Sequence, residues 1–335
     1  MNCSQNGNTC IFLYSCTASV DIVGDFGYKN IRQNPPHLST MCPMGGRFMS
    51  KDVKEPITYS QQIAKLQQRD IIIHDLADCE VFLSQVNYYR LSGYILPFID
   101  PAADKCCQPI EFDTIKSIYH FDAELRNLIS LSVERIEIYI RTQLAYFHAH
   151  HYGALGYIDP ANYNSLHDHI TFLGRIQSCI KDNSKSPVVI HHQTNYGGKF
   201  PIWVIIDYFT LGMLSHFYTD MPNQDKAFLA KTLYAANFKK LSSWLRCLTD
   251  LRNRCAHYSR LYYWAFSAIP NTGNPALASD RTLYPQIHML RIMYPDKAEW
   301  ATCFYNPLVK LVDKYKDQIQ LDHIGFPANW KDELK

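Results

Sequence analysis

The chain has 335 residues, which is enough for two ordinary domains or for one large domain with extensions. Hydrophobic residues make up 47% of it and aromatic residues 13%, which excludes a chain that is disordered overall. The formal net charge of +2 excludes a global attraction to nucleic acid or membrane, so a polyanionic partner would need a local basic patch.

The composition also bears on the compartment. No apolar run approaches the roughly 20 residues that cross a bilayer, and no Lys or Arg precedes Lys29 to form a signal-peptide n-region. The 11 cysteines are an odd number without repeated CxxC spacing, which favours reduced thiols over a disulfide framework. The letters KDEL near the end are followed by Lys335, so they are not a retention signal. We therefore expect a cytoplasmic protein without a membrane segment.

Residues 1–48 differ from the rest of the chain, with four of the 11 cysteines, few charges and no sustained helical or strand period. Gly45 and Gly46 stand shortly before Met49, and their codons can spell a purine-rich ribosome-binding sequence. We predict that residues 1–48 are not part of the native folded protein, either because translation starts at Met49 or because the segment is disordered. Peptides from this segment in protein expressed from its native upstream DNA would contradict the start at Met49.

Helical patterns begin after this segment. Thr58 stands at the N-cap position of a first helix, and Asp75–Val86 supplies a second short helix. The stretch NYYRLSGY (Asn87–Tyr94) is expected to end the second helix, with Gly93 as a break. Residues 49–112 are therefore predicted to form an N-terminal helical segment.

The longest predicted helix runs from Asp113 to His151. It contains no Pro, its apolar residues recur every three or four positions, Asp113 is a candidate N-cap and Gly153 is the expected stop. Residues 152–200 have the polar, loop-rich composition of a connecting segment. The apolar segment 201–218 is predicted to be central.

A second long helix is predicted over Lys239–Leu261, and a further helix over Asn306–Ile319 follows turn signals that begin at Pro270. These elements predict an all-α fold. Its helical core spans residues 113–263, and residues 264–335 form a C-terminal helical extension.

The second long helix has an apolar stripe that predicts its core-facing side: Leu241, Trp244, Leu245, Leu248, Leu251 and Cys255. A polar row lies opposite, consisting of Arg246, Asp250, Asn253 and His257, and it places Asn253 where it can touch His257. Arg252 falls inside the apolar stripe. A buried guanidinium needs a partner, and Glu134 and Glu137 of the first long helix are the candidates.

An intrahelical pair competes for one of these acids, because Glu137 stands four residues before Arg141. The partner of Arg252 therefore stays open at the level of the sequence.

The pair Arg252 and His257 has the side chains that RNA cleavage without a metal requires. A base must take the 2′-hydroxyl proton, an acid must protonate the leaving 5′-oxygen, and a cation must stabilise the phosphorane. Histidine suits the first two tasks and arginine the third. One copy of the pair is incomplete, so we expect two copies to face each other across a homodimer.

This spacing is not specific by itself. Arg141–His148 and Arg281–His288 also match a loose Arg-x4–6-His pattern, although Pro285 is expected to disrupt any helix in the second match. The alternative interpretation of Arg252 and His257 is an ordinary solvated polar face.

Five blocks carry a resemblance to a known family: YYRLSGY (88–94), FDAELRNLI (121–129), ERIEIYIRTQLAY (134–146), PIWVIIDYFTLGMLSHFY (201–218) and WLRCLTDLRNRCAHYSRLY (244–262). In this order they resemble bacterial abortive-infection (Abi-like) proteins of the AbiD/AbiF type, which are built on a HEPN domain. The resemblance runs from about Pro56 to Tyr263. It implies an all-α HEPN-type helical bundle with additional N- and C-terminal helices.

HEPN ribonucleases carry Arg, then a polar residue, three further residues and His, and Arg252, Asn253 and His257 match this pattern one for one. The resemblance therefore implies a dimeric, metal-independent endoribonuclease that needs no cofactor and leaves a 2′,3′-cyclic phosphate. Some relatives are associated with a small non-coding RNA. Many relatives read Arg-Leu-Trp/Tyr-Asn after the motif, whereas this chain reads Arg260-Leu261-Tyr262-Tyr263 and lacks the Asn.

Two further groups have a functional and a structural interpretation. Tyr88, Tyr89 and Arg90 can stack on bases and grip phosphate, or form a packed turn in which Arg90 pairs with an acid. The second long helix sets six cations against Asp250, as a patch for phosphate contacts or as a solvated helix face: Lys239, Lys240, Arg246, Arg252, Arg254 and Arg260. The histidines between 148 and 192 fit no common ligand spacing, so no metal site is predicted.

We therefore predict a cytoplasmic, homodimeric endoribonuclease toxin of anti-phage defence that acts on RNA. His257 is the expected acid or base, Arg252 stabilises the phosphorane, and Asn253 orients His257 or the phosphate. Glu134, Glu137, Arg141 and Asp250 are expected to support this site. The alternatives are a catalytically silent HEPN module that binds a small RNA, and a helical scaffold that binds only proteins.

Overall fold

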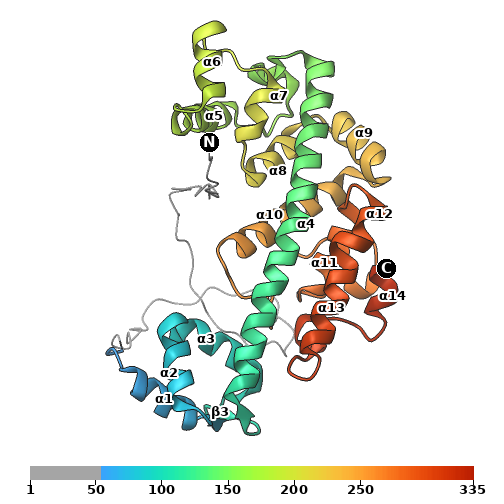
Figure 1. Ribbon diagram of the computed structural model, residues 1–335. Coiled ribbons are helices and arrows are strands. Elements are labelled where there is room, and N and C mark those ends of the chain that lie inside the picture. The colour runs from blue at the N-terminus through green and yellow to red at the C-terminus, as the bar shows by residue number, and fades with distance from the viewer. Residues whose placement is uncertain (1–53) are drawn as a thin grey trace, which may run out of the picture. The chain divides into compact units, whose positions relative to one another are not determined.

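A computed structural model describes residues 54–335, and the prediction for residues 1–48 lies outside them. Helices dominate the described part, with only short strands of two residues each, which confirms the all-α class (Figure 1). The elements up to the longest helix are α1 (Tyr59–Gln67), β1 (Ile71–Ile72), α2 (Leu76–Gln85), α3 (Tyr88–Ile95), β2 (Ile99–Asp100), β3 (Lys105–Cys106), β4 (Ile110–Glu111) and α4 (Phe112–Tyr152).

The first two helices begin where the sequence predicts. Thr58 accepts from the Gln61 backbone N–H while the Gln61 side chain accepts from the Thr58 N–H, which is a capping box at the start of α1. Asp75 caps α2 by accepting from the Asp78 N–H. The short strands tie the connections together, with β1 parallel to β4 and β2 antiparallel to β3.

The predicted break at Gly93 is wrong, because α3 continues through it from Tyr88 to Ile95. Asn87 starts this helix by accepting from the Tyr89 N–H, so the turn signal lies before the tyrosines. A Cβ on Gly93 would approach the Arg260 side chain to 3.1 Å. Close packing against Arg260 therefore explains this glycine better than a turn does.

Helix α4 is continuous over 41 residues, so it is roughly 62 Å long at the usual rise of about 1.5 Å per residue. It begins one residue before Asp113, with Glu111 as the N-cap, because β4 runs straight into the helix and Phe112 is buried in the core. Gly153 ends it with a φ of 82° and a ψ of 173°, as the sequence predicts.

The loop-rich interpretation of residues 152–200 is wrong from residue 169 onward. This part holds two helices, α5 (His169–Asp182) and α6 (Pro187–Asn195). Asp168 caps α5 by accepting from the Thr171 N–H, and Pro187 occupies the first position of α6, where a missing N–H costs nothing. The polar composition reflects exposed faces rather than a lack of helix.

Residues 201–218 are central, as predicted, but they do not form one helix. Helix α7 (Ile202–Ile205) passes into a 3₁₀ turn (Ile206–Tyr208), and α8 (Leu211–Asp220) begins after the cap at Thr210. The remaining helices are α9 (Asn223–Tyr234), α10 (Phe238–Ala256), α11 (Tyr284–Met293), α12 (Lys297–Trp300), α13 (Asn306–Tyr315) and α14 (Trp330–Leu334).

Two C-terminal expectations need correction. Pro285 does not disrupt a helix, because it lies in the first turn of α11, where proline fits. Helix α13 ends at Tyr315, four residues earlier than predicted, and a turn carries the chain on to Ile319.

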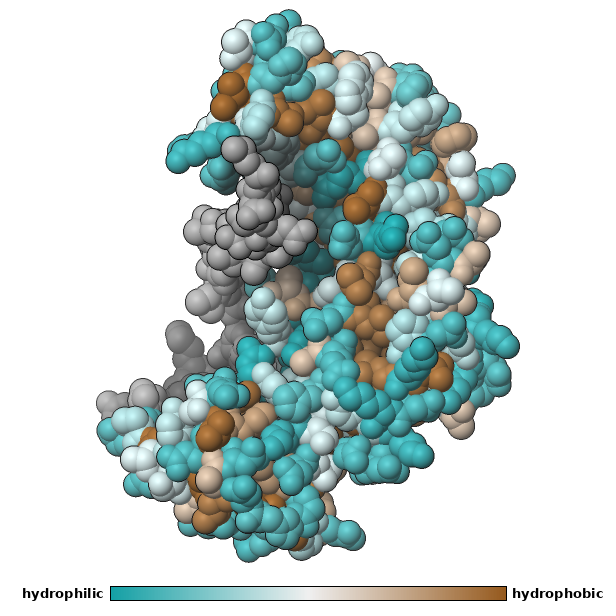
Figure 2. Space-filling model, in the orientation of Figure 1, coloured by the Kyte–Doolittle hydropathy of each residue, from teal (hydrophilic) through white to brown (hydrophobic). Residues whose placement is uncertain are grey.

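Helix α4 organises the core of residues 56–335. It packs against α3, α7, α8, α10, α11 and α13, so it contacts helices that precede it and helices that follow it in the sequence (Figure 1). On the face in Figure 2, hydrophobic residues form separate patches among hydrophilic ones. None of the helices in residues 54–335 combines the length and the apolar character that spanning a membrane requires.

Candidate functional site

Helix α10 is held in the core by the predicted apolar stripe, whose members are all buried: Leu241, Trp244, Leu245, Leu248, Leu251 and Cys255. The side chain of Asn237 caps its start by accepting from the Lys240 N–H. The stripe packs on α4 and α8. Residues on the other side of α10 are therefore positioned by a rigid, well-anchored helix.

The helix ends at Ala256, before the predicted end near Leu261. His257 is the C-cap, and Tyr258 adopts a left-handed backbone with a φ of 56°. Tyr258 N–H donates to the Cys255 carbonyl and Ser259 N–H donates to the Arg254 carbonyl, which is a Schellman motif without its usual glycine. His257 consequently projects from a helix end instead of a helix face, and its side chain is exposed.

The expected burial of Arg252 is wrong, because its side chain is exposed. The apolar stripe reaches its edge at this position, and the space between α10 and α4 opens there into a pocket of about 290 Å³. Among residues 54–335, the Arg252 guanidinium donates its side-chain hydrogen bond to the neighbouring Asn253 Oδ1, at 3.3 Å. An arginine at the rim of a pocket keeps most of its five N–H donors available for a ligand.

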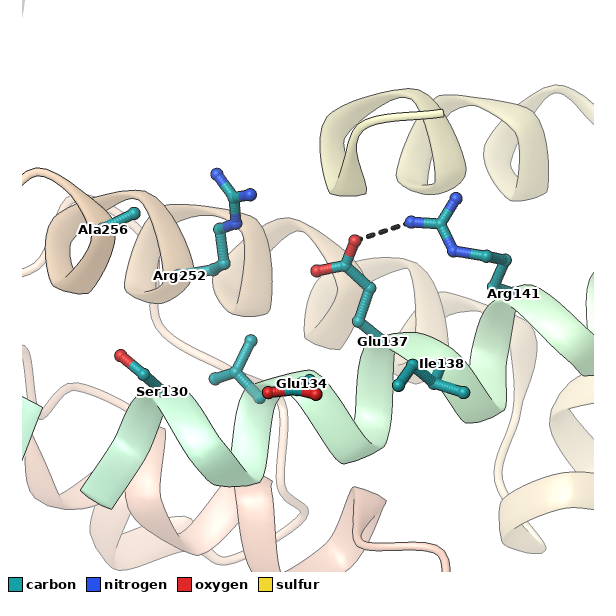
Figure 3. Close-up of a pocket in the computed structure, with 8 residues that line it drawn as sticks. Ser130, Glu134, Glu137, Ile138, Arg141, Arg252 and Ala256 are labelled. Carbon is teal, nitrogen blue, oxygen red and sulfur yellow. Dashed lines mark hydrogen bonds and ion pairs between the residues drawn. The ribbon is translucent and has the colours of Figure 1, made fainter. Parts of the chain in front are cut away.

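Figure 3 shows how the pocket is built. Arg252 comes from α10, whereas Glu134, Glu137 and Arg141 come from α4, and the Glu137 carboxylate points into the space between the two guanidinium groups. Glu137 accepts from Arg141 at 2.7 Å, so the competing intrahelical pair forms. Glu134 is exposed, and among the described residues no ion pair joins it or Glu137 to Arg252.

Three of the four residues in the polar row line a different pocket. Arg246, Asp250 and Asn253 line a pocket of about 930 Å³ on the other flank of α10, with α8 residues that include His216. The Asn253 amide contacts Arg252, and its backbone carbonyl accepts the His257 N–H at 2.9 Å. Asn253 therefore contacts Arg252 through its side chain, which orients the guanidinium, and contacts His257 through its backbone.

The segment after His257 is fixed by a buried carboxylate that sequence reasoning missed. Asp122 of α4 accepts from the backbone N–H groups of Tyr262 at 2.7 Å and Leu261 at 3.1 Å. It also pairs with Arg126 and accepts from the Tyr94 hydroxyl at 2.6 Å. The signal was an Asp and an Arg four residues apart inside an apolar pattern, which is typical of a buried ion pair.

Tyr263 occupies the position where many relatives of the resembled family carry Asn. Its φ is 51°, in the left-handed region that Asn tolerates far better than Tyr. The chain turns there, directly after the Asp122 contacts. The backbone therefore takes a left-handed turn at this position although the residue is Tyr instead of Asn.

The tyrosines and the arginine of α3 are distributed over different environments. Tyr89 is 74% exposed, whereas Tyr88 is half-buried next to Arg69. Arg90 donates to the backbone carbonyl of Tyr258 instead of pairing with an acid, which corrects that expectation. Arg90 thus supports the turn that positions His257.

The six cations do not form one surface. Arg254 is half-buried over the Trp264 ring at 3.7 Å, where burial lowers the pKa of its guanidinium, and Arg260 donates to the Gly93 carbonyl. Lys239, Arg246 and Arg252 are exposed, and Lys240 is partly buried. The exposed members of this set, Lys239, Arg246 and Arg252, therefore all lie on α10.

The cysteine thiols of α10 are unreactive near neutral pH. Burial raises the pKa of the Cys247 and Cys255 thiols to about 12, so both stay protonated near neutral pH. Within residues 54–335 no three His, Cys, Asp or Glu side chains are grouped so that they could hold a metal ion.

Comparison with known proteins places the chain in a family. A family model described as "Abi-like protein" matches residues 81–263, which is more than half of the chain and includes α3 to α10 and the Asp122 contacts. Neither the search of curated proteins nor the search of solved structures returned a match. By its match over residues 81–263, the chain belongs to the Abi-like protein family.

Proposed function

We propose that this protein is a HEPN-type endoribonuclease of the AbiD/AbiF kind, which cuts RNA without a metal as part of abortive-infection defence. One observation carries the proposal. Arg252 and His257 are both exposed at the same end of a rigid helix, inside the segment that matches the Abi-like family. Neither side chain is part of the buried core, so both can contact a substrate.

The chemistry is a transesterification within the RNA strand. His257, acting as a base, takes the proton of a 2′-hydroxyl, and the 2′-oxygen attacks the adjacent phosphorus. The bond to the 5′-oxygen breaks, an acid returns a proton to it, and a 2′,3′-cyclic phosphate remains. Arg252 stabilises the negative charge of the phosphorane, and Asn253 holds the guanidinium through its 3.3 Å contact.

One protomer supplies a single His257 for two proton transfers. A homodimer in which two α10 ends approach each other supplies a second histidine and a second arginine. The base and the acid are then the His257 side chains of the two copies. RNA is the substrate, and a small non-coding RNA is a further candidate partner.

The test compares RNA ends in cells that express the full chain, the Arg252→Ala variant or the His257→Ala variant. We expect new 2′,3′-cyclic phosphate ends with the wild type and a loss on the order of 100-fold or more in each variant. Arg175→Ala and His191→Ala are matched controls, because both side chains are exposed on other helices. Both controls should cut RNA like the wild type.

The alternatives predict other results. Identical end profiles for all variants, combined with retained RNA binding, would support a catalytically silent module that acts by binding RNA. Failure of the wild type to bind any RNA would support a protein-binding scaffold. Toxicity that survives His257→Ala would also contradict the nuclease.

A further inference from the structure

A second pocket adjoins the candidate site along α4. It measures about 390 Å³ and lies between the C-terminal half of α4 and residues 202–208, which comprise α7 and its 3₁₀ turn and are called the α7 segment. Its lining includes Arg141, Tyr146 and His150 from α4, and Trp203 and Asp207 from the α7 segment. Nothing in the proposed catalytic chemistry uses these aromatic residues.

The α7 segment is built to present its tryptophan outward. Ile202, Ile205 and Ile206 are fully buried against the core, which fixes the segment on α4. Trp203 and Asp207 lie four residues apart on the opposite side, and Trp203 stays 53% exposed. Exposing so much indole to water is unfavourable, so a planar apolar partner would gain from covering it.

The α4 wall of the pocket is aromatic as well. Tyr146 is 63% exposed, and its ring lies 4.0 Å from that of His150, tilted by 33°. His150 Nδ1 lies 2.8 Å from the Tyr146 carbonyl, which can only accept, so Nδ1 carries the proton. The Nε2 of a neutral His150 is then an acceptor for the edge of a ligand.

The charges favour an uncharged ligand part over a phosphate. Arg141 is paired with Glu137 and also donates to the Ile206 carbonyl, and the Asp207 carboxylate lines the same pocket. Of the side chains that line this pocket, Arg141 and Asp207 carry opposite charges, and the Arg141 charge is further neutralised by Glu137. Aromatic walls with a few acceptors and donors at the edge suit a nucleobase, which has a π-face and a polar rim.

The two pockets are adjacent, because Arg141 lines both of them. The pocket with Arg252 lies on one side of Arg141, and the pocket with Trp203 lies on the other. A ligand that runs along α4 therefore passes from the candidate cleavage residue to the aromatic walls.

From this arrangement we infer that the Trp203–Tyr146 pocket is a stacking subsite for an unpaired nucleobase of the RNA strand that is cut at Arg252. This inference rests on the proposed ribonuclease function and adds a substrate class to it. The bases of a duplex are stacked on each other and cannot enter the pocket, so the substrate is single-stranded near the cut.

The experiment measures binding of short, fluorescein-labelled oligoadenylate and oligouridylate to the full chain with His257→Ala, which leaves the RNA uncut; the anisotropy of the label gives the affinity of every variant. We expect both RNAs to quench tryptophan fluorescence, and Trp203→Phe to remove most of that quenching. Trp203 is exposed, whereas Trp244, Trp300 and Trp330 are buried and Trp264 is partly buried against Arg254. Adding Trp203→Ala should weaken binding about 5- to 100-fold, which is the effect of one lost base stack. Trp203→Phe should retain most of the affinity.

Three controls define specificity. Phe228→Ala removes an aromatic side chain that is 58% exposed on α9, outside this pocket, and should leave binding unchanged. A perfect RNA duplex of the same length should not quench the fluorescence. An oligonucleotide with a single abasic position should lose affinity in the parent chain and lose little more in the Trp203→Ala variant.

Several results would overturn the inference. These are unchanged affinity after Trp203→Ala, equal loss after Phe228→Ala, or equal quenching by duplex RNA. A change of oligomeric state in Trp203→Ala, seen by light scattering and parallel to the binding loss, would assign the surface to contact between copies instead. The proposed function is tested separately. A wild type that never cuts RNA but shows Trp203-dependent RNA binding would contradict the nuclease activity and still support the stacking subsite.

Discussion

His148 is a buried imidazole near the C-terminal end of α4, and it has no hydrogen-bond partner among the described residues. It packs against the rings of Tyr152, Tyr163 and Phe217. Burial lowers the pKa of its imidazole to about 4, with a smaller contribution from His151. His148 is therefore a neutral packing residue, which also argues against a role for the Arg141–His148 match.

This lowered pKa makes stability depend on pH. The folded-state pKa of about 4 lies below the usual value near 6.5, so the contribution is complete above about pH 6.5 and is lost as the pH falls toward 4. Between about pH 7 and pH 5 we expect the free energy of unfolding to fall by about 2 kcal/mol through this group. Urea unfolding at both pH values measures it.

His148→Leu should remove that pH-dependent loss and leave stability near neutral pH unchanged or higher, because it deletes two unsatisfied buried nitrogens. His191→Leu is the matched control at an exposed histidine and should keep the full pH dependence. The same acid-induced loss in His148→Leu and in the wild type would contradict the assignment.

At the scale of elements, the site depends on where helices end. Helix α10 stops at Ala256 through backbone hydrogen bonds across the left-handed Tyr258, and Arg90 and Asp122 hold the next segment of the chain. Helix α4 stops at Gly153, in a backbone region that only glycine adopts easily. The two ends differ because α10 gains tertiary support for a strained residue, whereas α4 uses the intrinsic freedom of glycine.

A pair of glycine substitutions tests this interpretation. Gly153→Ala should lower the free energy of unfolding by about 1–3 kcal/mol, since no side chain within 4 Å gains from the added methyl group while φ stays positive. Gly174→Ala, inside α5 and equally open, should raise it by roughly 0.5–1 kcal/mol. Urea denaturation measures both, and equal signs for the two would contradict it.

At the scale of the whole molecule, catalysis as proposed needs two chains. Each protomer presents Arg252 in one pocket and Asn253 in another, with one His257 at the helix end. If acid and base come from different protomers, a single altered protomer disables the shared site. If each protomer works alone, it disables only half of the activity.

Mixed dimers distinguish these cases. Wild-type and His257→Ala chains with different tags are co-expressed, and the mixed dimer is isolated through both tags. We expect its RNA cleavage to fall on the order of 100-fold, because one of the two proton transfers has lost its catalyst. A mixed dimer with His191→Ala should retain full activity. Half-activity in the His257→Ala mixed dimer would exclude a shared site.

The sequence by itself determined the all-α class, the position of α4 and its glycine stop, and the core face of α10, because these depend on local periodicity and capping. The same local signals were misleading where packing decides. Polar composition hid α5 and α6, and Gly93 resembled a break although it makes room for Arg260.

Only the tertiary structure decided what surrounds the motif. Periodicity placed Arg252 in the apolar stripe, but α4 and α10 separate there and leave a pocket, so the guanidinium is solvent-accessible. The contacts of Asp122 with residues 261 and 262 join residues about 140 positions apart in the sequence. Trp203 and Arg141, which are also distant in sequence, line the same pocket. Such pairings depend on how helices pack, and a local pattern along one chain does not contain them.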